Sequence, residues 1–267
     1  MSTMDIEAGP LNARRAKAPQ RWRGFVLPLG ALALWWFVSR HAQPGRGVMV
    51  SPAQVLQTAL EQAQSGALAR ALSASLAREL TGFAIGTTLG LALGALLGVS
   101  KLANRAIAPI FNTFKQVSLF AWIPLISVWF GLGDAAKVVF LSLAALVPVV
   151  VHTSDAIRAV PSSWTEVART FGYRKLQTLR YVVVPAALPS IFTGFYLALI
   201  YSWLATLGAE YLLVAGSGIG NTLVDGSEQF RMDLVVFGVI VVGTTGWALN
   251  ALARAIQHRW FDASRYA

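Results

Sequence analysis

Side chains that could carry out covalent chemistry are few and scattered in this sequence of 267 residues. The absence of cysteine excludes disulfides, thiolate metal sites and a cysteine nucleophile. The three histidines, His41, His152 and His258, are far apart and form no metal-ligand pattern such as HExxH. The nucleophile motif GxSxG and the phosphate-binding motifs GxxxxGKS and GxxxxGKT are absent as well. We therefore expect no enzymatic activity, no metal site and no cofactor bound by this chain.

An organised polar stretch interrupts the apolar sequence at residues 165–181, where Glu166 is the single acid among several Lys and Arg residues. Ser163 and Glu166 have the spacing of a capping box, with Ser163 as the N-cap of a short helix. Gly172 fits the position just after the helix end, where glycine is preferred. A second helical stretch follows, and Pro185 fits the first turn of the next apolar helix. These signals predict a helix-turn-helix by which another protein could hold this chain.

The composition places this polar stretch in a membrane protein. The sequence is 55% hydrophobic and 13% charged, with a mean hydropathy of +0.57, whereas soluble domains are about 25% charged. A membrane-spanning helix needs about 20 mainly apolar residues. We predict an all-α integral membrane protein with about six transmembrane helices, at residues 24–38, 79–99, 106–132, 135–156, 185–207 and 234–254.

The distribution of positive charge predicts the orientation of these helices. Of the 22 Lys and Arg residues, 15 lie in four segments that we therefore expect in the cytoplasm, together with both termini: 1–23, 100–105, 157–184 and 254–267. The net charge of +10 thus indicates membrane topology, and we expect no nucleic-acid partner. The first apolar segment lacks a small-x-small cleavage site, which favours an uncleaved span over a signal peptide.

These inferences divide the chain into a core and its extensions. We expect a basic cytoplasmic tail, a first transmembrane helix, an exterior segment with an amphipathic helix, a core of five transmembrane helices with a cytoplasmic loop at 158–184, and a second cytoplasmic tail. In order, apart from that loop, these parts occupy residues 1–23, 24–40, 41–78, 79–256 and 257–267.

The second predicted span carries a glycine at every fourth position. Residues four apart lie on one face of a helix, where glycines allow another backbone to approach closely. We interpret this row as a helix-packing face, with a substrate-facing groove as the alternative. The glycines are Gly82, Gly86, Gly90, Gly94 and Gly98.

A few residues within the spans are candidates for a translocation pathway. Lys115 either extends its ammonium group to the cytoplasmic face or lines a pathway for an anion. Trp122 is an aromatic residue of the core or the interface, and Pro124 could kink its helix and open a path.

Glu210, near the end of the fifth span, is the other pathway candidate. It could cap the following "SGIG" segment or pair with Lys137 or Arg231, with a role as a gate as the alternative. We find no acidic pair deep in the membrane and no repeat, both of which an ion-driven secondary transporter would need.

The polar stretch also resembles a known motif. Glu166, Val167, Ala168 and Gly172, followed after nine residues by "VVVP" ending at Pro185, resemble the EAA loop of ABC-importer permeases. The usual form is EAA, three residues, G, nine residues and IxLP, so the departures are conservative Val substitutions. The sequence is similar to the nitrate/sulfonate/taurine branch of that family over four further segments, at 121–141, 185–199, 207–223 and 254–261.

The resemblance implies a type I (MetI-like) ABC importer permease fold in the bacterial inner membrane. It implies a homodimer of permeases, two cytoplasmic P-loop ATPase subunits that hold ATP and Mg²⁺, and an exterior solute-binding protein. Ser163 and the motif residues would then couple the ATPase to the membrane helices. The implied substrate is a small anion, an aliphatic sulfonate such as taurine, with nitrate, bicarbonate or a small heterocycle as alternatives.

Overall fold

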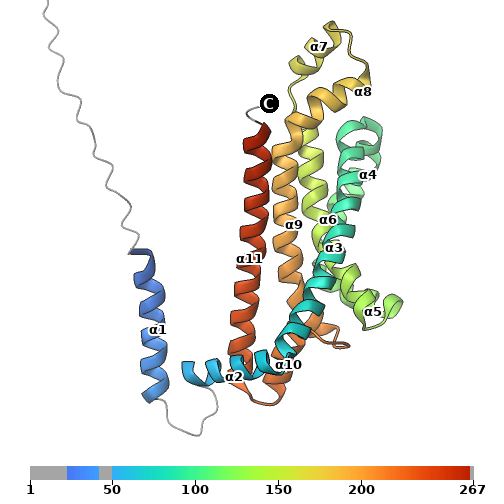
Figure 1. The fold of residues 1–267 in the computed structure, drawn as a ribbon. Helices are drawn as coiled ribbons and strands as arrows, with labels where there is room; N and C mark the ends of the chain where they lie inside the picture. The colour runs from blue at the N-terminus through green and yellow to red at the C-terminus, as the bar shows by residue number, and fades with distance from the viewer. Residues whose placement is uncertain (1–22, 42–49, 265–267) are drawn as a thin grey trace, which may run out of the picture. The chain divides into compact units, whose positions relative to one another are not determined.

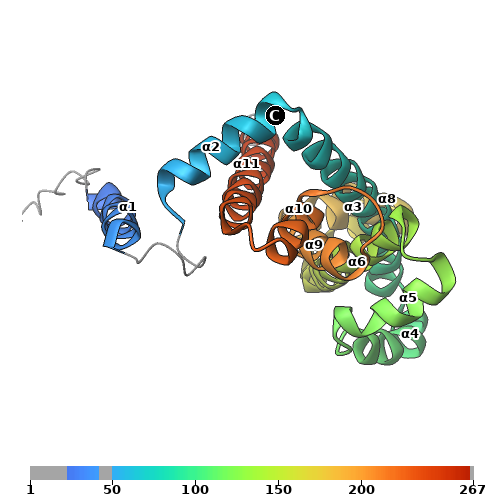
Figure 2. The ribbon, with the colours of Figure 1, turned by 90° about the horizontal axis from the view of Figure 1, so that it is seen from below.

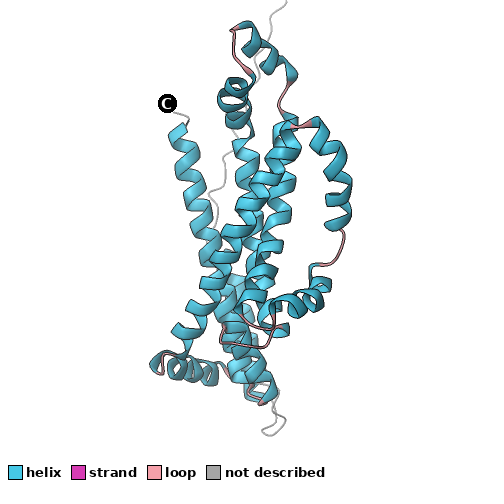
Figure 3. Ribbon diagram, turned by 90° about the vertical axis from the view of Figure 1, so that its right-hand side faces the viewer, coloured by secondary structure: helices cyan, strands magenta, loops and turns pink. Residues whose placement is uncertain are grey.

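The computed structural model describes residues 23–41 and 50–264, and this part of the chain is built from helices joined by short loops (Figures 1 and 3). The helices are α1 (Arg23–His41), α2 (Pro52–Gln64), α3 (Ala67–Val99), α4 (Lys101–Phe114), η1 (Leu119–Trp122), α5 (Ile123–Phe130), α6 (Asp134–Ala159), α7 (Ser162–Thr170), α8 (Lys175–Thr178), η2 (Leu179–Val183), α9 (Val184–Leu212), α10 (Ile219–Glu228) and α11 (Met232–Ser264).

Four of the described helices are long and apolar enough to span a membrane. They are α3, α6, the continuous run from α8 to the end of α9, and α11 to Gln257. The pair formed by α4 and the run of η1 and α5 makes a fifth if it counts as one bent span. The predicted all-α membrane fold is therefore confirmed. The first predicted span forms α1, which is not among these candidate spans. The predicted tail at 1–22 lies outside the described residues.

Helix α6 lies between α3 and α9 and is the most deeply buried helix of the bundle (Figure 1). Phe140, Ala145 and Val149 are fully buried at its centre. The row of five glycines on α3 faces α6 along its whole length. A Cβ added at Gly90 would come within 2.9 Å of the Val149 Cβ, and one at Gly94 within 2.7 Å of the Thr153 Cβ. The two backbones therefore approach more closely than any larger residue would allow.

The continuous helix expected at 106–132 is instead broken. α4 ends at Phe114, and the run of η1 and α5 that follows is bent by 92° relative to it. Pro124 lies in the first turn of α5, where its missing N–H costs nothing. In an unbroken helix the same proline would remove a hydrogen bond and clash with the preceding turn. Pro124 therefore begins a helix here and does not kink one.

The segment before the first long span forms α2, as the amphipathic pattern at 41–78 predicts, while residues 42–49 lie outside the described part. Gly66, with φ +68°, separates α2 from α3. α2 lies across the end of α11, where the Thr58 hydroxyl donates to the Asp233 carboxylate at 2.6 Å (Figures 1 and 2). The tail predicted from residue 257 is helical to Ser264 as part of α11.

Candidate functional site

Helices α7 and α8 form a helical hairpin that projects beyond α6, α9 and α11 at one end of the bundle (Figure 1). Gly172 ends α7 with φ +77°, a conformation that glycine adopts without steric cost. The Tyr173 N–H donates to the Ala168 carbonyl at 3.0 Å and the Gly172 N–H to the Arg169 carbonyl at 2.9 Å. These two bonds make a Schellman motif, which fixes the angle between the two helices of the hairpin.

The capping box expected at the start of α7 is wrong. α7 begins at Ser162 with Pro161 as its N-cap, and no side chain caps it. Pro161 already has the extended conformation of an N-cap residue, with φ −58° and ψ 135°, so Ser163 lies inside the first turn. Glu166 is consequently free of a capping role. Its carboxylate is exposed, and within the described residues it has no ion-pair partner.

The hairpin exposes large apolar side chains, most of them on or next to α7, which lies outside the candidate spans. Phe171 is 77% exposed and Leu176 is 74% exposed, and Trp164 and Val167 are both more than half exposed. Of the motif residues on the hairpin, Ala168 is the buried one, and Val183 of the following "VVVP" is buried as well. Apolar residues of this size in a polar segment indicate a surface that another protein covers. α8 continues through η2 into α9, where Pro185 lies in the first turn. The hairpin is therefore connected to a membrane-spanning helix without an intervening loop.

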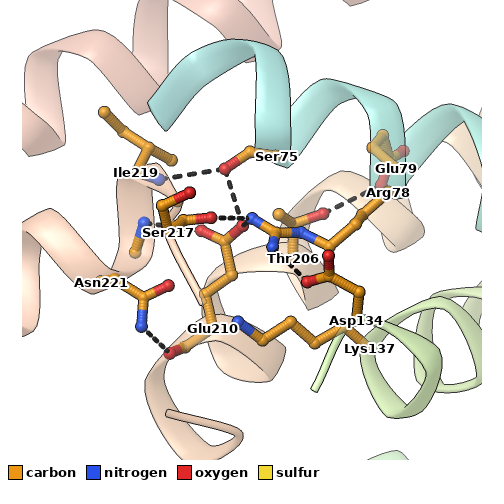
Figure 4. A network of polar contacts seen from close by, with 12 residues as sticks. Ser75, Arg78, Glu79, Asp134, Lys137, Thr206, Glu210, Ser217, Ile219 and Asn221 are labelled. Atoms are coloured by element: carbon orange, nitrogen blue, oxygen red, sulfur yellow. Dashed lines mark hydrogen bonds and ion pairs between the residues drawn. The ribbon is translucent and has the colours of Figure 1, made fainter. Parts of the chain in front are cut away.

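A buried ion-pair network lies at the opposite end of the bundle and joins α3, α6, α9 and α10 (Figure 4). Glu210 is its centre and is 1% exposed. Its carboxylate accepts hydrogen bonds from the Ser75 hydroxyl, the Arg78 Nη2 and the Gly220 N–H, each at 2.7 Å. The Gly220 bond is the capping contact with the "SGIG" segment that the sequence suggested. The ion pair suggested with Arg231 is wrong, because Arg231 pairs with Asp233 at 2.8 Å.

Arg78 is the residue of this network that sequence reasoning missed. Its Nη1 donates to Asp134 at 2.7 Å, and its Nη2 also donates to the Ser217 carbonyl. Lys137, the other partner suggested for Glu210, donates instead to the Ala215 carbonyl at 2.8 Å. The two cations thus hold the loop between α9 and α10 against α3 and α6. The sequence feature that could have indicated this network is the adjacent Arg78 and Glu79, at the start of the apolar run predicted at 79–99.

Glu79, the neighbour of Arg78, is fully buried between α3 and α9. Its Oε1 accepts a hydrogen bond from the Ser202 hydroxyl at 2.6 Å, and its Oε2 accepts one from the Thr206 hydroxyl at 2.9 Å. Both donors lie on α9, so Glu79 joins that helix to α3. This contact was also missed, because a sequence does not show which hydroxyls of a neighbouring helix face a buried acid.

A cavity of about 610 Å³ lies between the α4–η1 segment and helices α6 and α9. Of the four residues predicted for a pathway, Lys115 and Trp122 line this cavity, whereas Pro124 and Glu210 do not. Lys115 is the C-cap of α4 and lies at the break before η1, not in the first turns of a span. The position expected for Lys115, in the first turns of a span, is therefore wrong.

The apolar bundle and the capped hairpin at its end define a polytopic membrane protein. The family model of the binding-protein-dependent transport system inner membrane component matches residues 86–263. The chain therefore belongs to this family, the permease components of ABC importers.

Three relatives illustrate the range of the family. The chain is 32% identical to SsuC of Escherichia coli, a protein with the name of an aliphatic sulfonates transport permease, over 88% of this chain and 89% of that one. It is 34% identical to the nitrate import permease NrtB of Leptolyngbya laminosa, over 60% and 57%. It is 31% identical to the bicarbonate transport permease CmpB of Synechococcus elongatus, over 61% and 58%. The alignments thus span less than two thirds of the last two relatives.

Two solved structures share the fold. An amino acid ABC transporter with histidines matches with a TM-score of 0.62 and 17% identity, over 76% of this chain and 97% of that one. The inward-facing MetNI methionine ABC transporter matches with a TM-score of 0.56 and 24% identity, over 73% and 98%. The predicted type I importer permease fold is therefore confirmed.

Proposed function

We propose that this chain is the membrane-spanning permease subunit of an ATP-driven importer, and that it performs no chemistry itself. A separate P-loop ATPase would bind and hydrolyse ATP with Mg²⁺, and would dock on the α7–α8 hairpin. The observation that supports this most directly is the hairpin itself. It is rigidly capped at Gly172, it exposes apolar side chains beyond the spans, and it continues into α9.

The coupling mechanism follows from the connection between the hairpin and the bundle. When the ATPase subunits close on ATP, they would carry α7 and α8 with them. Because α9 is continuous with α8 and packs along α6, a displacement of the hairpin would move these helices as a body. In this mechanism Glu166, Val167 and Ser163 belong to the docking surface, while Ala168, Gly172 and Pro185 hold its shape.

We propose that the cargo is a small anion, and an aliphatic sulfonate such as taurine in particular. The relatives named for sulfonates, nitrate and bicarbonate support the anion. The relative named for sulfonates is the one among these three that aligns over nearly its whole length. Nitrate, bicarbonate and a small heterocycle are the alternatives. An exterior solute-binding protein would deliver the cargo to the α10 end of the bundle.

The proposed assembly contains two permeases and two ATPases in the bacterial inner membrane. Both termini and the hairpin would face the cytoplasm, as the excess of Lys and Arg in these segments favours. Two identical permeases are the simplest assembly in which each ATPase has a hairpin to dock on.

Co-purification tests the docking role. The full chain, extracted in mild detergent, should carry a P-loop ATPase at about one copy per permease by mass spectrometry. Glu166→Lys reverses the charge of the exposed carboxylate on α7 and should abolish this association while membrane insertion is retained. Glu228→Lys makes the same change at an exposed site on α10 and should retain the ATPase. Undiminished association in Glu166→Lys would exclude the docking role of this carboxylate.

A further inference from the structure

Helix α2 has three distinct faces. Val55 and Thr58 are buried, and Thr58 contacts α11 through Asp233. A second face is exposed and apolar, and we call it the leucine stripe; it consists of Ala53, Leu56, Leu60 and Ala63. The third face is exposed and polar, and it consists of Gln54, Gln57, Glu61 and Gln64. Residues three and four apart share one side of a helix, so each set forms a continuous row. Leu56 is 63% exposed and Leu60 is 54% exposed, so the stripe presents large apolar side chains.

Helix α2 lies at the level where a membrane span begins. The candidate span of α11 has 26 residues, from Met232 to Gln257, and is thus about 39 Å long. A bilayer with its headgroup regions is about 40–45 Å thick, so the first turn of α11 lies among the headgroups. Asp233 is in that turn, and its carboxylate accepts the 2.6 Å hydrogen bond from the Thr58 hydroxyl of α2. Figures 1 and 2 show α2 lying across this end of α11. The middle of α2 is therefore held at the boundary between acyl chains and water.

The leucine stripe has the chemistry of a lipid contact. After Gly66, the chain enters the span of α3, which exposes apolar side chains such as Leu80 and Leu89. The α11 span exposes Val239 in the same way. Apolar side chains exposed along a span contact acyl chains, and the stripe places side chains of the same kind at the end of these two spans. The stripe carries no charge and no hydrogen-bonding group, whereas protein interfaces have a polar rim and hydrogen bonds throughout. Its composition therefore favours lipid over a protein partner.

An exposed aromatic residue in the turn between α10 and α11 adds to this surface. Phe230 is 82% exposed and has φ +56°, in the position after a helix end that glycine usually takes. Its N–H donates to the Ser227 carbonyl at 3.2 Å. The Arg231 N–H donates to the Gly226 carbonyl at 2.8 Å, which completes a Schellman motif. A phenylalanine in this conformation is strained, and the exposed ring does not offset that strain by packing in the protein. The Arg231 Nη2 is 4.0 Å from the Glu61 Oε2 of α2, so the turn lies beside α2.

We propose that α2 is an interfacial helix, and that the leucine stripe and Phe230 insert into the lipid at the α10 end of the bundle. The polar row of α2 faces water, and its buried face contacts the protein. The three faces of α2 thus match the three environments at the edge of a membrane protein. Helices of this kind bury their apolar face about 5–10 Å into the boundary between headgroups and acyl chains. The contact fixes the depth of the first turns of α3 and α11, to which α2 is joined.

The cysteine-free sequence allows the environment of single positions to be measured, because an introduced cysteine is the only thiol. Leu56→Cys and Phe230→Cys place a thiol in each part of the proposed contact. Gln57→Cys, on the polar row next to Leu56, is the matched control. Each variant of the full chain is labelled with the fluorophore nitrobenzoxadiazole and placed in phosphatidylcholine nanodiscs. Quenching is measured with iodide in the water and with lipids that carry a nitroxide either near the headgroup or near the end of the acyl chain.

We expect the labels at positions 56 and 230 to be quenched about twice as strongly by the shallow nitroxide as by the deep one, because the insertion is only about 5–10 Å. Iodide should quench the label at position 57 at least about threefold more strongly than the label at position 56, since the polar row faces water. Leu60→Asp in the Leu56→Cys chain should weaken quenching by the shallow nitroxide about twofold or more, because a charge opposes insertion of the stripe. Gln64→Asp adds the same charge to the polar row and should leave this quenching unchanged.

Three results would overturn the proposal. Iodide quenching at position 56 equal to that at position 57 would place the stripe in water. Protection of position 56 from iodide and from both nitroxides would show that protein covers the stripe, either a second copy or another segment of this chain. Stronger quenching by the deep nitroxide than by the shallow one would place α2 within the hydrocarbon and not at its boundary. The measurement needs no ATPase and no cargo, so its outcome is independent of the co-purification test.

Discussion

The buried ion-pair network predicts a large loss of stability when Glu210 is replaced by Ala. The carboxylate is 1% exposed and accepts three hydrogen bonds at 2.7 Å. Removing one partner of a buried ion pair costs about 3–5 kcal/mol, and Arg78 would keep only the mostly exposed Asp134 as its counter-charge. At about 2 °C per kcal/mol for a chain of this size, the melting temperature should fall by roughly 6–10 °C.

Thermal unfolding followed by tryptophan fluorescence measures this loss. All variants are heated in the same detergent at one scan rate, because membrane proteins unfold irreversibly. Glu61→Ala is the matched control, since Glu61 is 53% exposed and its nearest cation, Arg231, is 4.0 Å away. An exposed pair of this kind contributes about 0–1 kcal/mol, so this control should shift the melting temperature by no more than about 2 °C.

A double-mutant cycle between Arg78 and Glu210 tests whether the two buried charges stabilise each other. Arg78→Gln should leave the Glu210 carboxylate buried without its cation, and Glu210→Gln should leave Arg78 with only the mostly exposed Asp134 as a counter-charge, so each should destabilise the protein. The double variant leaves neither, so its loss should be smaller than the sum of the single losses by about 1–3 kcal/mol. If the two losses add to within about 0.5 kcal/mol, the two side chains act independently and the buried pair does not hold the α9–α10 loop.

The remaining predictions concern packing, capping and the second buried acid. Gly86→Val should lower the melting temperature by roughly 4 °C or more, because a Cβ there meets the Ser142 carbonyl, whereas Gly243→Ala, with open space around it on α11, should be neutral or stabilising. Gly172→Ala should weaken ATPase binding in a pull-down several-fold, because a side chain at φ +77° costs about 1–2 kcal/mol; equal binding would exclude the Schellman motif as a determinant. Glu79→Gln should cost less than about 1 kcal/mol, since an amide still bonds both hydroxyls, whereas Glu79→Ala leaves both unpaired and should cost about 2–4 kcal/mol by the same melting assay.

The elements that the sequence predicted well are those that depend on short-range patterns. The packing face of α3 can be recognised from glycines spaced four residues apart. The end of α7 can be recognised from Gly172, a glycine that follows a helical run. The long apolar helices follow in the same way from hydropathy. Each of these signals is contained within about 20 residues of sequence, so no knowledge of the tertiary structure was needed.

The errors occurred where two local signals competed. Ser163 and Glu166 have capping-box spacing, but Pro161 already supplies the backbone conformation of an N-cap, and the helix begins two residues earlier than that spacing predicts. The residues at 106–132 are mainly apolar, but Lys115, Gln116 and Ser118 interrupt them, and Pro124 favours a helix start over a helix interior. The chain breaks before that, at residues 115–118 between α4 and η1, so hydropathy joined two helices that this polar break separates.

The contacts that the sequence missed depend on tertiary structure. Arg78 and Glu210 are 132 residues apart, and Glu79 and Ser202 are 123 residues apart. Ion pairs and ligand sites built from several helices have no spacing in a single sequence that would reveal them.

The most direct test of the central claim is ATP-dependent uptake of radiolabelled taurine into proteoliposomes that contain this permease, its co-purifying ATPase and the solute-binding protein. We expect uptake that requires ATP and Mg²⁺, persists when ionophores remove every ion gradient, and is lost in Glu166→Lys. Nitrate and bicarbonate uptake measured in the same vesicles identifies the anion. Uptake by the permease alone, driven by an ion gradient and independent of ATP, would show that the chain is a secondary transporter and would contradict the account.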